Sequence, residues 1–145
     1  MRDILVPVSP GELLDKITIL RIKSARIGDP EKLRHVEIEL DLLTSIWRES
    51  GCAAQTDPEI ARALAADERA LEAINEKLWD IEDRIREQER ADRFDREFIE
   101  LARAVYLSND ERAAIKKRIN LRLGSRIVEE KSYAPYRRSV NSAPQ

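Results

Sequence analysis

Four carboxylates in the segment NEKLWDIEDRIREQE, residues 75–89, are the first candidates for chemistry in this sequence. Glu76, Asp80, Asp83 and Glu87 follow the spacing i, i+4, i+7 and i+11, which places them on one narrow face of a helix. Carboxylate oxygens in such an arrangement suit a divalent cation, Mg²⁺ or Mn²⁺. The same pattern is also typical of a solvated helix face, or of a polar seam that another helix covers.

Two features of this acidic stripe favour a covered face over a solvated one. A solvated helix usually has Lys or Arg four residues after each acid. Here Glu72, Glu76 and Asp83 are instead followed by further acids at that spacing. Trp79 lies among the acids, and a large indole on that face indicates that a helix packs on it or a ligand binds to it.

The segment SNDERAAIKKRINLRLG, residues 108–124, supplies cations that could meet these acids. Polar side chains lie within or beside its apolar face: Asn109, Arg112, Lys116 and Asn120. One interpretation is an internal salt-bridge network from Arg112 and Lys116 to Asp80 and Asp83. The other is a ligand site, in which the acids hold a cation and the two bases bind phosphate or carboxylate. The two interpretations are compatible, and both stay open.

Lys131 and Tyr133, in the segment SRIVEEKSYAPYRR, are further ligand-binding candidates. A lysine and a tyrosine in a loop can bind an anionic or sugar ligand, or they can pin a terminal segment across a bundle. Asp15, near the start of the first predicted helix, is interpreted as an acid that interacts with the helix dipole. The alternative is that Ile19 and Ile22 shield it.

Capping motifs predict the helices that position these residues. For the helices that begin near residues 10, 30, 58 and 108, each start combines a capping Ser, Thr or Asp with a following Pro or Glu, and a glycine marks the end of the first, second and last helices. The expected helices are residues 10–27, 30–50, 58 to about 90, 94–107 and 108–124, with the fourth separate from or continuous with the third. The last of these is predicted to begin with the capping box Ser108-Asn109-Asp110-Glu111.

Heptad spacing of apolar residues in 30–50 and 58–90 predicts that these two helices form a long antiparallel hairpin. The fold class is therefore all-α, a helical bundle built on this hairpin, with a short extended arm at residues 3–8. We expect one domain, residues 1–136, and a flexible tail, residues 137–145. The first helix is apolar on more than one side, which favours a homodimer.

Composition excludes several classes of protein. The net charge of −2 gives no overall field for nucleic acid. The apolar run at the N-terminus is too short for a signal peptide or membrane span, so a cytoplasmic location without membrane insertion is expected. The single cysteine, Cys52, excludes an internal disulfide and a cysteine-based zinc site. The Walker, GxGxxG, GxSxG and HExxH patterns are all missing from the sequence.

The segments SPGELLDKITILRIK (9–23), LWDIEDRIR (78–86), NDERAAIKKRIN (109–120) and EEKSY (129–133) resemble an uncharacterised bacterial family of short all-helical proteins. The resemblance covers residues 5–133 and implies proximity to glycosyltransferase and cell-surface polysaccharide functions. It assigns no catalytic residue. The segment LLDKITILRIK is also similar to the chorismate mutase architecture, in which basic side chains bind a dicarboxylate, but the later helices do not match it.

Two classes of function follow. The first is a non-enzymatic interaction or accessory module, linked to surface-polysaccharide assembly and acting on a protein partner. The second is a small metal-dependent or anion-binding enzyme that acts on a phosphorylated or carboxylated small molecule. We favour the first because the sequence shows no nucleophile paired with a base. An enzyme requires carboxylates and cations that converge on a concave space, whereas an accessory module would hold them in closed ion pairs.

Overall fold

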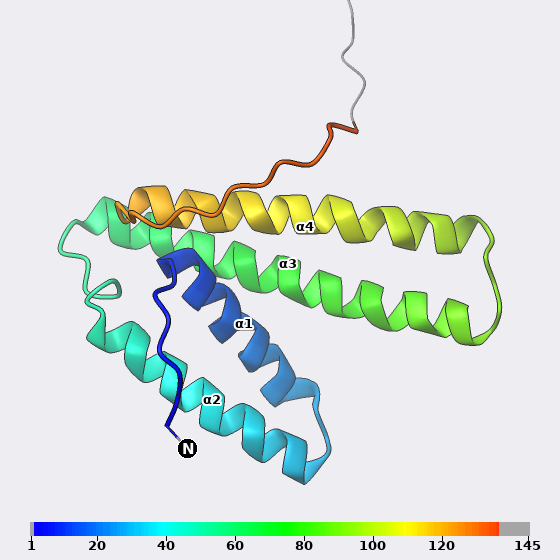
Figure 1. The fold of residues 1–145 in the computed structure, drawn as a ribbon, viewed down its shortest axis with the longest axis horizontal. Coiled ribbons are helices and arrows are strands. Elements are labelled where there is room, and N and C mark those ends of the chain that lie inside the picture. The colour runs from blue at the N-terminus through cyan, green and yellow to red at the C-terminus, as the bar shows by residue number, and fades with distance from the viewer. Residues whose placement is uncertain (1, 137–145) are drawn as a thin grey trace, which may run out of the picture.

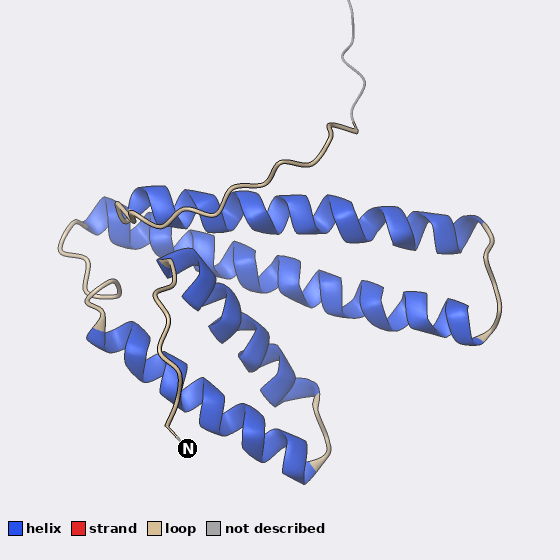
Figure 2. Ribbon diagram, in the orientation of Figure 1, coloured by secondary structure: helices blue, strands red, loops and turns tan. Residues whose placement is uncertain are grey.

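The structure, a computed structural model, describes residues 2–136, and all regular secondary structure in that range is helical (Figures 1 and 2). The helices are α1 (Pro10–Arg26), α2 (Pro30–Glu49), α3 (Pro58–Arg90) and α4 (Arg96–Arg122). The predicted all-α fold class is confirmed. The predicted tail, 137–145, lies outside the described residues. Among the described residues, no helix is both long enough and apolar enough to cross a membrane.

The capping signals place most helix ends correctly. The Ser9 hydroxyl accepts a hydrogen bond from the backbone N–H of Glu12, so the predicted box starts α1. Asp29 and Asp57 cap α2 and α3 in the same way, each before a proline. Gly51 and Gly124 follow the ends of α2 and α4 with positive φ angles, which glycine adopts without strain.

The predicted start of a helix at Ser108 is wrong. α4 runs without interruption from Arg96, and Ser108 is buried in its interior. The reason is that residues 96–122 contain neither Gly nor Pro, so the backbone hydrogen bonds continue through the apparent capping box. The true cap is Asp95, whose side chain accepts from the N–H groups of Glu97 and Phe98.

A long antiparallel hairpin is present, but its helices are α3 and α4 rather than the predicted second and third helices. No Cα atom of α2 comes within 8 Å of a Cα atom of α3. Instead α2 packs along α1, and α1 also lies against α3 and α4 (Figure 1). Heptad spacing shows which face of a helix is apolar, but it does not identify the helix that covers that face. In the structure α1 and α4, rather than α2, cover the apolar face of α3.

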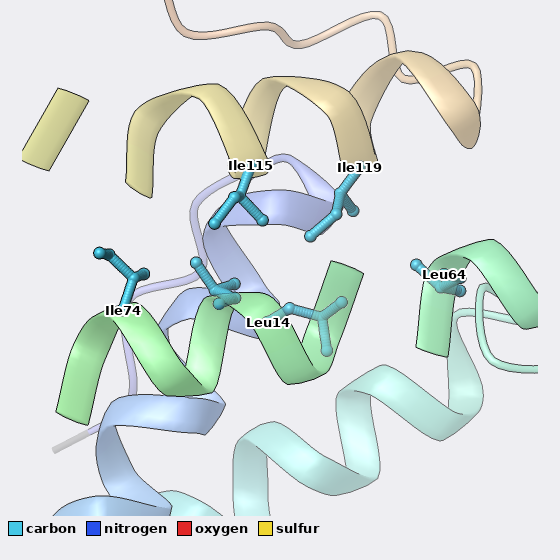
Figure 3. Close-up of a cluster of buried hydrophobic side chains, with 6 residues drawn as sticks. Leu14, Leu64, Ile74, Ile115 and Ile119 are labelled. Carbon is cyan, nitrogen blue, oxygen red and sulfur yellow. The ribbon is translucent and has the colours of Figure 1, made fainter. Parts of the chain in front are cut away.

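The core forms where α1, α3 and α4 meet (Figure 3). Its buried side chains are Leu14, Leu64, Leu71, Ile74, Ile115 and Ile119. Trp47 at the end of α2 packs against this cluster, but Val36 is the only buried side chain of α2 itself. The core therefore fixes α1 against α3 and α4, and α2 is a peripheral layer held mainly by α1.

Candidate functional site

Asp15 of α1 is the most buried acid of the described chain, with 1% of its surface exposed. Arg112 of α4 binds its carboxylate in a bidentate manner: Nε donates to Oδ1 at 2.9 Å, and the guanidinium also donates to Oδ2. Asn75 of α3 donates to Oδ1 at 2.9 Å, and the ammonium of Lys116 lies 3.5 Å from Oδ2. This buried ion-pair cluster therefore joins three helices through one carboxylate.

The cluster is held in its charged state. Burial raises the pKa of Asp15, but the hydrogen bonds from Arg112 and Asn75 and the charge of Lys116 outweigh it, so the pKa lies below the ordinary value. The hydrogen bond to Asp15 raises the pKa of Arg112. Burial lowers the pKa of Lys116, but the hydrogen bond to Glu12 and the charge of Asp15 together raise it by more, so the pKa lies above its ordinary value.

The start of α1 sits directly on α4. The N–H of Gly11 donates to Oδ1 of Asn120 at 2.7 Å, which satisfies a donor at the helix N-terminus that has no partner within the helix. A Cβ atom at position 11 would lie 2.5 Å from the backbone oxygen of Lys116, so only glycine fits this approach. Asn120 is buried here and anchors the start of α1, and its predicted role in ligand binding stays a prediction.

The segment 125–136 runs back along α4 and completes the site (Figure 1). The ammonium of Lys116 donates to Glu12 at 2.5 Å and lies 3.5 Å from Glu129. Glu129 in turn pairs with Lys131 at 2.8 Å, and the ammonium of Lys131 is 5.9 Å from the ring centre of Tyr133. These contacts of Lys131 and Tyr133 lie within the segment itself, and the ion pairs that join it to α4 are Lys116 with Glu129 and Lys117 with Glu130, so both sequence interpretations of Lys131 and Tyr133 stay predictions.

A cleft of about 390 Å³ opens above the buried cluster. It is lined by five of the seven predicted ligand-binding candidates: Asn109, Arg112, Lys116, Lys131 and Tyr133. Its other charged lining residues are Glu12, Asp110 and Glu129. The motifs SPGELLDK, NDERAAIKKRIN and EEKSY, which lie far apart in the sequence, therefore meet in one cleft.

A longer groove of about 580 Å³ continues from this cleft along α4, sharing with it Asn109, Asp110, Lys131 and Tyr133. It also contains Tyr106 and Tyr136, so all three tyrosines of the chain line one surface. The rings of Tyr106 and Tyr136 are 5.3 Å apart in an edge contact. We call this surface, whose lining includes Tyr106, Asn109, Asp110, Lys131, Tyr133 and Tyr136, the tyrosine groove.

The predicted metal candidates line different hollows of the structure. Glu76 and Asp80 line a groove between α3 and α4, whereas Asp83 lines a hollow beside α1, and Glu87 lies one turn further along α3. Among residues 2–136, no group of three or more His, Cys, Asp and Glu side chains is placed to hold a metal ion. A hydrogen bond from Arg26 of α1 to Asp80, together with the nearby charges of Glu76 and Asp83, raises the pKa of that arginine, so three of the four carboxylates lie near one arginine side chain.

The predicted salt bridges from Arg112 and Lys116 to Asp80 and Asp83 are replaced by bonds to Asp15 and Glu12 of α1. The register of the α3–α4 hairpin explains the difference. It places Arg118 and Arg122 of α4 beside Asp67, and Glu97 beside Arg84. Arg112 lines one hollow with Asp83, but its ion pair is to Asp15, and Lys116 pairs with Glu12 at the start of α1.

Trp79 lies outside the cleft. It lines a hollow of about 470 Å³ together with Asp83 and Arg112. The guanidinium of Arg26 lies 5.8 Å from its ring centre and donates to Asp80 at 2.5 Å. The indole is thus half-buried and lines a hollow, the arrangement expected of a ligand-binding residue, and its role stays a prediction.

Sequence reasoning missed Glu12 and Asp15 as members of the site. The preferred interpretation of Asp15, an acid that faces the helix dipole, is wrong, and the shielded alternative is correct. A signal was present, because Asp15 shares a helix face with the apolar side chains of Ile19 and Ile22. Asn75, Tyr106 and Asp110 gave no comparable signal, because their roles depend on which helices become neighbours.

The fold and the site define an all-α protein with a buried ion-pair cluster under a mixed-charge cleft. Residues 4–143 match the model of a family described as "Family of unknown function (DUF6165)", and the chain belongs to that family. No curated protein and no solved structure matches the chain.

Proposed function

We propose that this protein is a non-enzymatic interaction module. The observation that supports this most directly is that the two cations at the base of the cleft are already paired within the chain. Arg112 is bound to Asp15, and Lys116 to Glu12, in a region of low exposure. Cations held in this way fix geometry, and they are poor candidates for stabilising charge that develops in a transition state.

We also propose that the protein takes part in surface-polysaccharide assembly, that it is cytoplasmic, and that its source is a bacterium. The support is the resemblance carried by the four sequence segments, together with the sequence evidence against a membrane span. In this role the cluster would set the spacing of α1, α4 and the segment 125–136, so that the cleft and the tyrosine groove form a stable recognition surface for a partner.

The proposal also includes a homodimer. The outer face of α2 carries Ile38, Leu42 and Ile46, which are exposed and spaced four residues apart on one side of the helix. Two copies of this stripe can pair antiparallel about a two-fold axis at Leu42, which would bring His35 of one copy near Glu49 of the other. This self-complementary pattern supports a second copy as the occupant of the face.

The alternative is a small enzyme that binds an anionic substrate, with a chorismate-mutase-like bundle or Mg²⁺- or Mn²⁺-dependent chemistry as its variants. One observation favours it: the cleft contains Arg112, Lys116 and Lys131, which could bind a phosphorylated or carboxylated molecule if the internal pairs opened. The two functions differ in what happens to the ligand.

An incubation assay distinguishes them. The protein is incubated with phosphorylated sugars, nucleotide-sugars, dicarboxylates and neutral oligosaccharides, with and without Mg²⁺ or Mn²⁺, and the compounds are followed by ¹H and ³¹P NMR. We expect every compound to be recovered unchanged. Conversion of any compound that is lost in Lys131→Ala but retained in Lys32→Ala, a control at an exposed lysine of α2, would establish the enzyme instead.

A further inference from the structure

We propose that the tyrosine groove binds an uncharged oligosaccharide. The inference rests on the proposed non-enzymatic function and names the chemical class of its ligand. It starts from an uneven distribution: aromatic residues make up 5% of the chain, yet its three tyrosines all line this groove. Tyr106, Tyr133 and Tyr136 are 43%, 77% and 49% exposed, so their rings present large surfaces to solvent.

Exposed tyrosine rings suit the faces of sugar rings. The C–H groups on one face of a pyranose carry partial positive charge, and the face of an aromatic ring is negative, so the two surfaces attract as they exclude water. The phenol hydroxyls at the ring edges can exchange hydrogen bonds with sugar hydroxyls. Tyr106 and Tyr136 meet edge to face, so one element of the groove offers two differently oriented aromatic surfaces.

The polar residues of the groove match hydroxyl groups, which donate and accept at once. Asp110 accepts, Lys131 keeps donor hydrogens beyond the one that pairs with Glu129, and Asn109 both donates and accepts. The charges of Asp110 and Lys131 cancel, so the groove has no net charge for attracting an ion. The adjoining cations, Arg112 and Lys116, are bound to Asp15 and Glu12, which makes a phosphate or carboxylate a poorer fit than a neutral ligand.

A proline-rich peptide is the competing occupant, because it also packs on tyrosine rings. Proline has a carbonyl acceptor and no N–H. A polyproline ligand would therefore bury Asp110 and leave its carboxylate without a donor, which is unfavourable. The groove is also long: from Tyr106 to Lys116 the cleft and groove follow about 15 Å of α4, enough for several linked sugar rings.

The test uses tyrosine labelled with ¹³C, because three tyrosines give three sets of ring signals that single Phe variants assign. The intact protein is titrated with linear neutral hexasaccharides of glucose, mannose and N-acetylglucosamine, and separately with glucose 1-phosphate and decaproline. We expect the Tyr106 and Tyr133 signals to shift with at least one hexasaccharide. Tyr106→Ala should weaken that binding about tenfold, equivalent to about 1.4 kcal/mol, and Tyr106→Phe much less.

Phe94→Ala is the matched control, since Phe94 is an exposed aromatic residue that packs on Phe98 away from the groove. It should leave hexasaccharide binding unchanged. Binding of decaproline or glucose 1-phosphate in place of the hexasaccharides, the lack of any tyrosine shift, or binding that Tyr106→Ala does not weaken would each overturn the inference. Recovery of a cleaved or modified hexasaccharide would instead overturn the non-enzymatic function, while leaving the groove assignment intact.

Discussion

Replacement of Arg112 by Met tests whether the buried cluster holds the fold together. Methionine keeps a long flexible side chain but removes the charge and both hydrogen bonds to Asp15. Asp15 would then be left in an almost fully buried position with only Asn75 and the more distant Lys116 to stabilise its charge. The substitution therefore creates a poorly compensated buried carboxylate rather than a simple loss of surface.

The expected loss of stability is large. Removing one partner of a buried ion pair typically costs about 3–5 kcal/mol, because the other charge stays desolvated. Here Arg112 is 28% exposed and Lys116 remains nearby, so we place the loss near the lower end, about 3 kcal/mol. For a chain of 145 residues, this corresponds to a fall in melting temperature of roughly 10 °C.

The loss should depend on pH. In the wild type the pKa of Asp15 is lowered, so its stabilising contribution is present above the ordinary value of 3.8 and is lost as the pH falls through the lowered pKa. In Arg112→Met the main group that lowers this pKa is gone, and burial should raise it. Protonated Asp15 needs no cation, so the difference in melting temperature between wild type and variant should shrink as the pH falls toward 3.8.

Thermal and urea unfolding at several pH values would measure these effects, with Arg103→Met, an exposed position on the same helix, as the control. A double-mutant cycle with Asp15→Asn isolates the pairwise energy. Asp15→Asn in the Arg112→Met background should recover part of the stability, because it removes the stranded charge. A loss below about 1 kcal/mol from Arg112→Met, equal to that of a surface pair, would refute the claim that the cluster is effectively desolvated.

Three further predictions follow from other contacts. Gly11→Ala should lower stability by about 1–3 kcal/mol in urea unfolding, because its Cβ would press on the backbone oxygen of Lys116; an unchanged midpoint would mean that α1 can shift away from α4. Asp67→Leu should change stability by less than about 1 kcal/mol, since Arg118 and Arg122 can turn to solvent, and a loss like that at Arg112 would contradict this. Leu42→Cys in a Cys52→Ser background should form an intermolecular disulfide on mild oxidation, because Leu42 lies at the proposed two-fold axis. Arg103→Cys in the same background should stay monomeric, and monomers in both cases would refute the homodimer.

The helix boundaries were predictable because they depend on local chemistry. Ser9, Asp29 and Asp57 cap their helices through bonds to residues two or three positions away, and such bonds can be read from sequence. The same reasoning failed at Ser108, where a capping pattern lies inside a helix that has no breaker. Local capping signals show where a helix can begin, and the continuation of hydrogen bonds through the segment decides whether it does.

The pairing of helices was not predictable in the same way. The apolar faces of α2 and α3 have similar heptad spacing, and a short loop joins them, yet α3 packs against α4 and α1. Arg112 and Lys116 were correctly expected to face the protein, because their helical positions fix their direction. Their ion-pair partners depend on which helix lies opposite, and the sequence does not show this. The prediction therefore named Asp80 and Asp83, whereas the partners in the structure are Asp15 and Glu12.

The close approach of α1 to α4 links the buried cluster to the pairing of the helices. Gly11 allows α1 to approach α4 closely, and this approach brings Asp15 within reach of Arg112. The buried carboxylate in turn makes other registers of α1 against α4 unfavourable, because a slip of one turn would leave it without its arginine. The cluster thus specifies how the helices pair, and the same pairing places Lys116 where Glu129 can bring the segment 125–136 onto α4. The tyrosine groove exists only because that segment is held there, so the structural role of the cluster and the proposed recognition role of the groove depend on the same contacts.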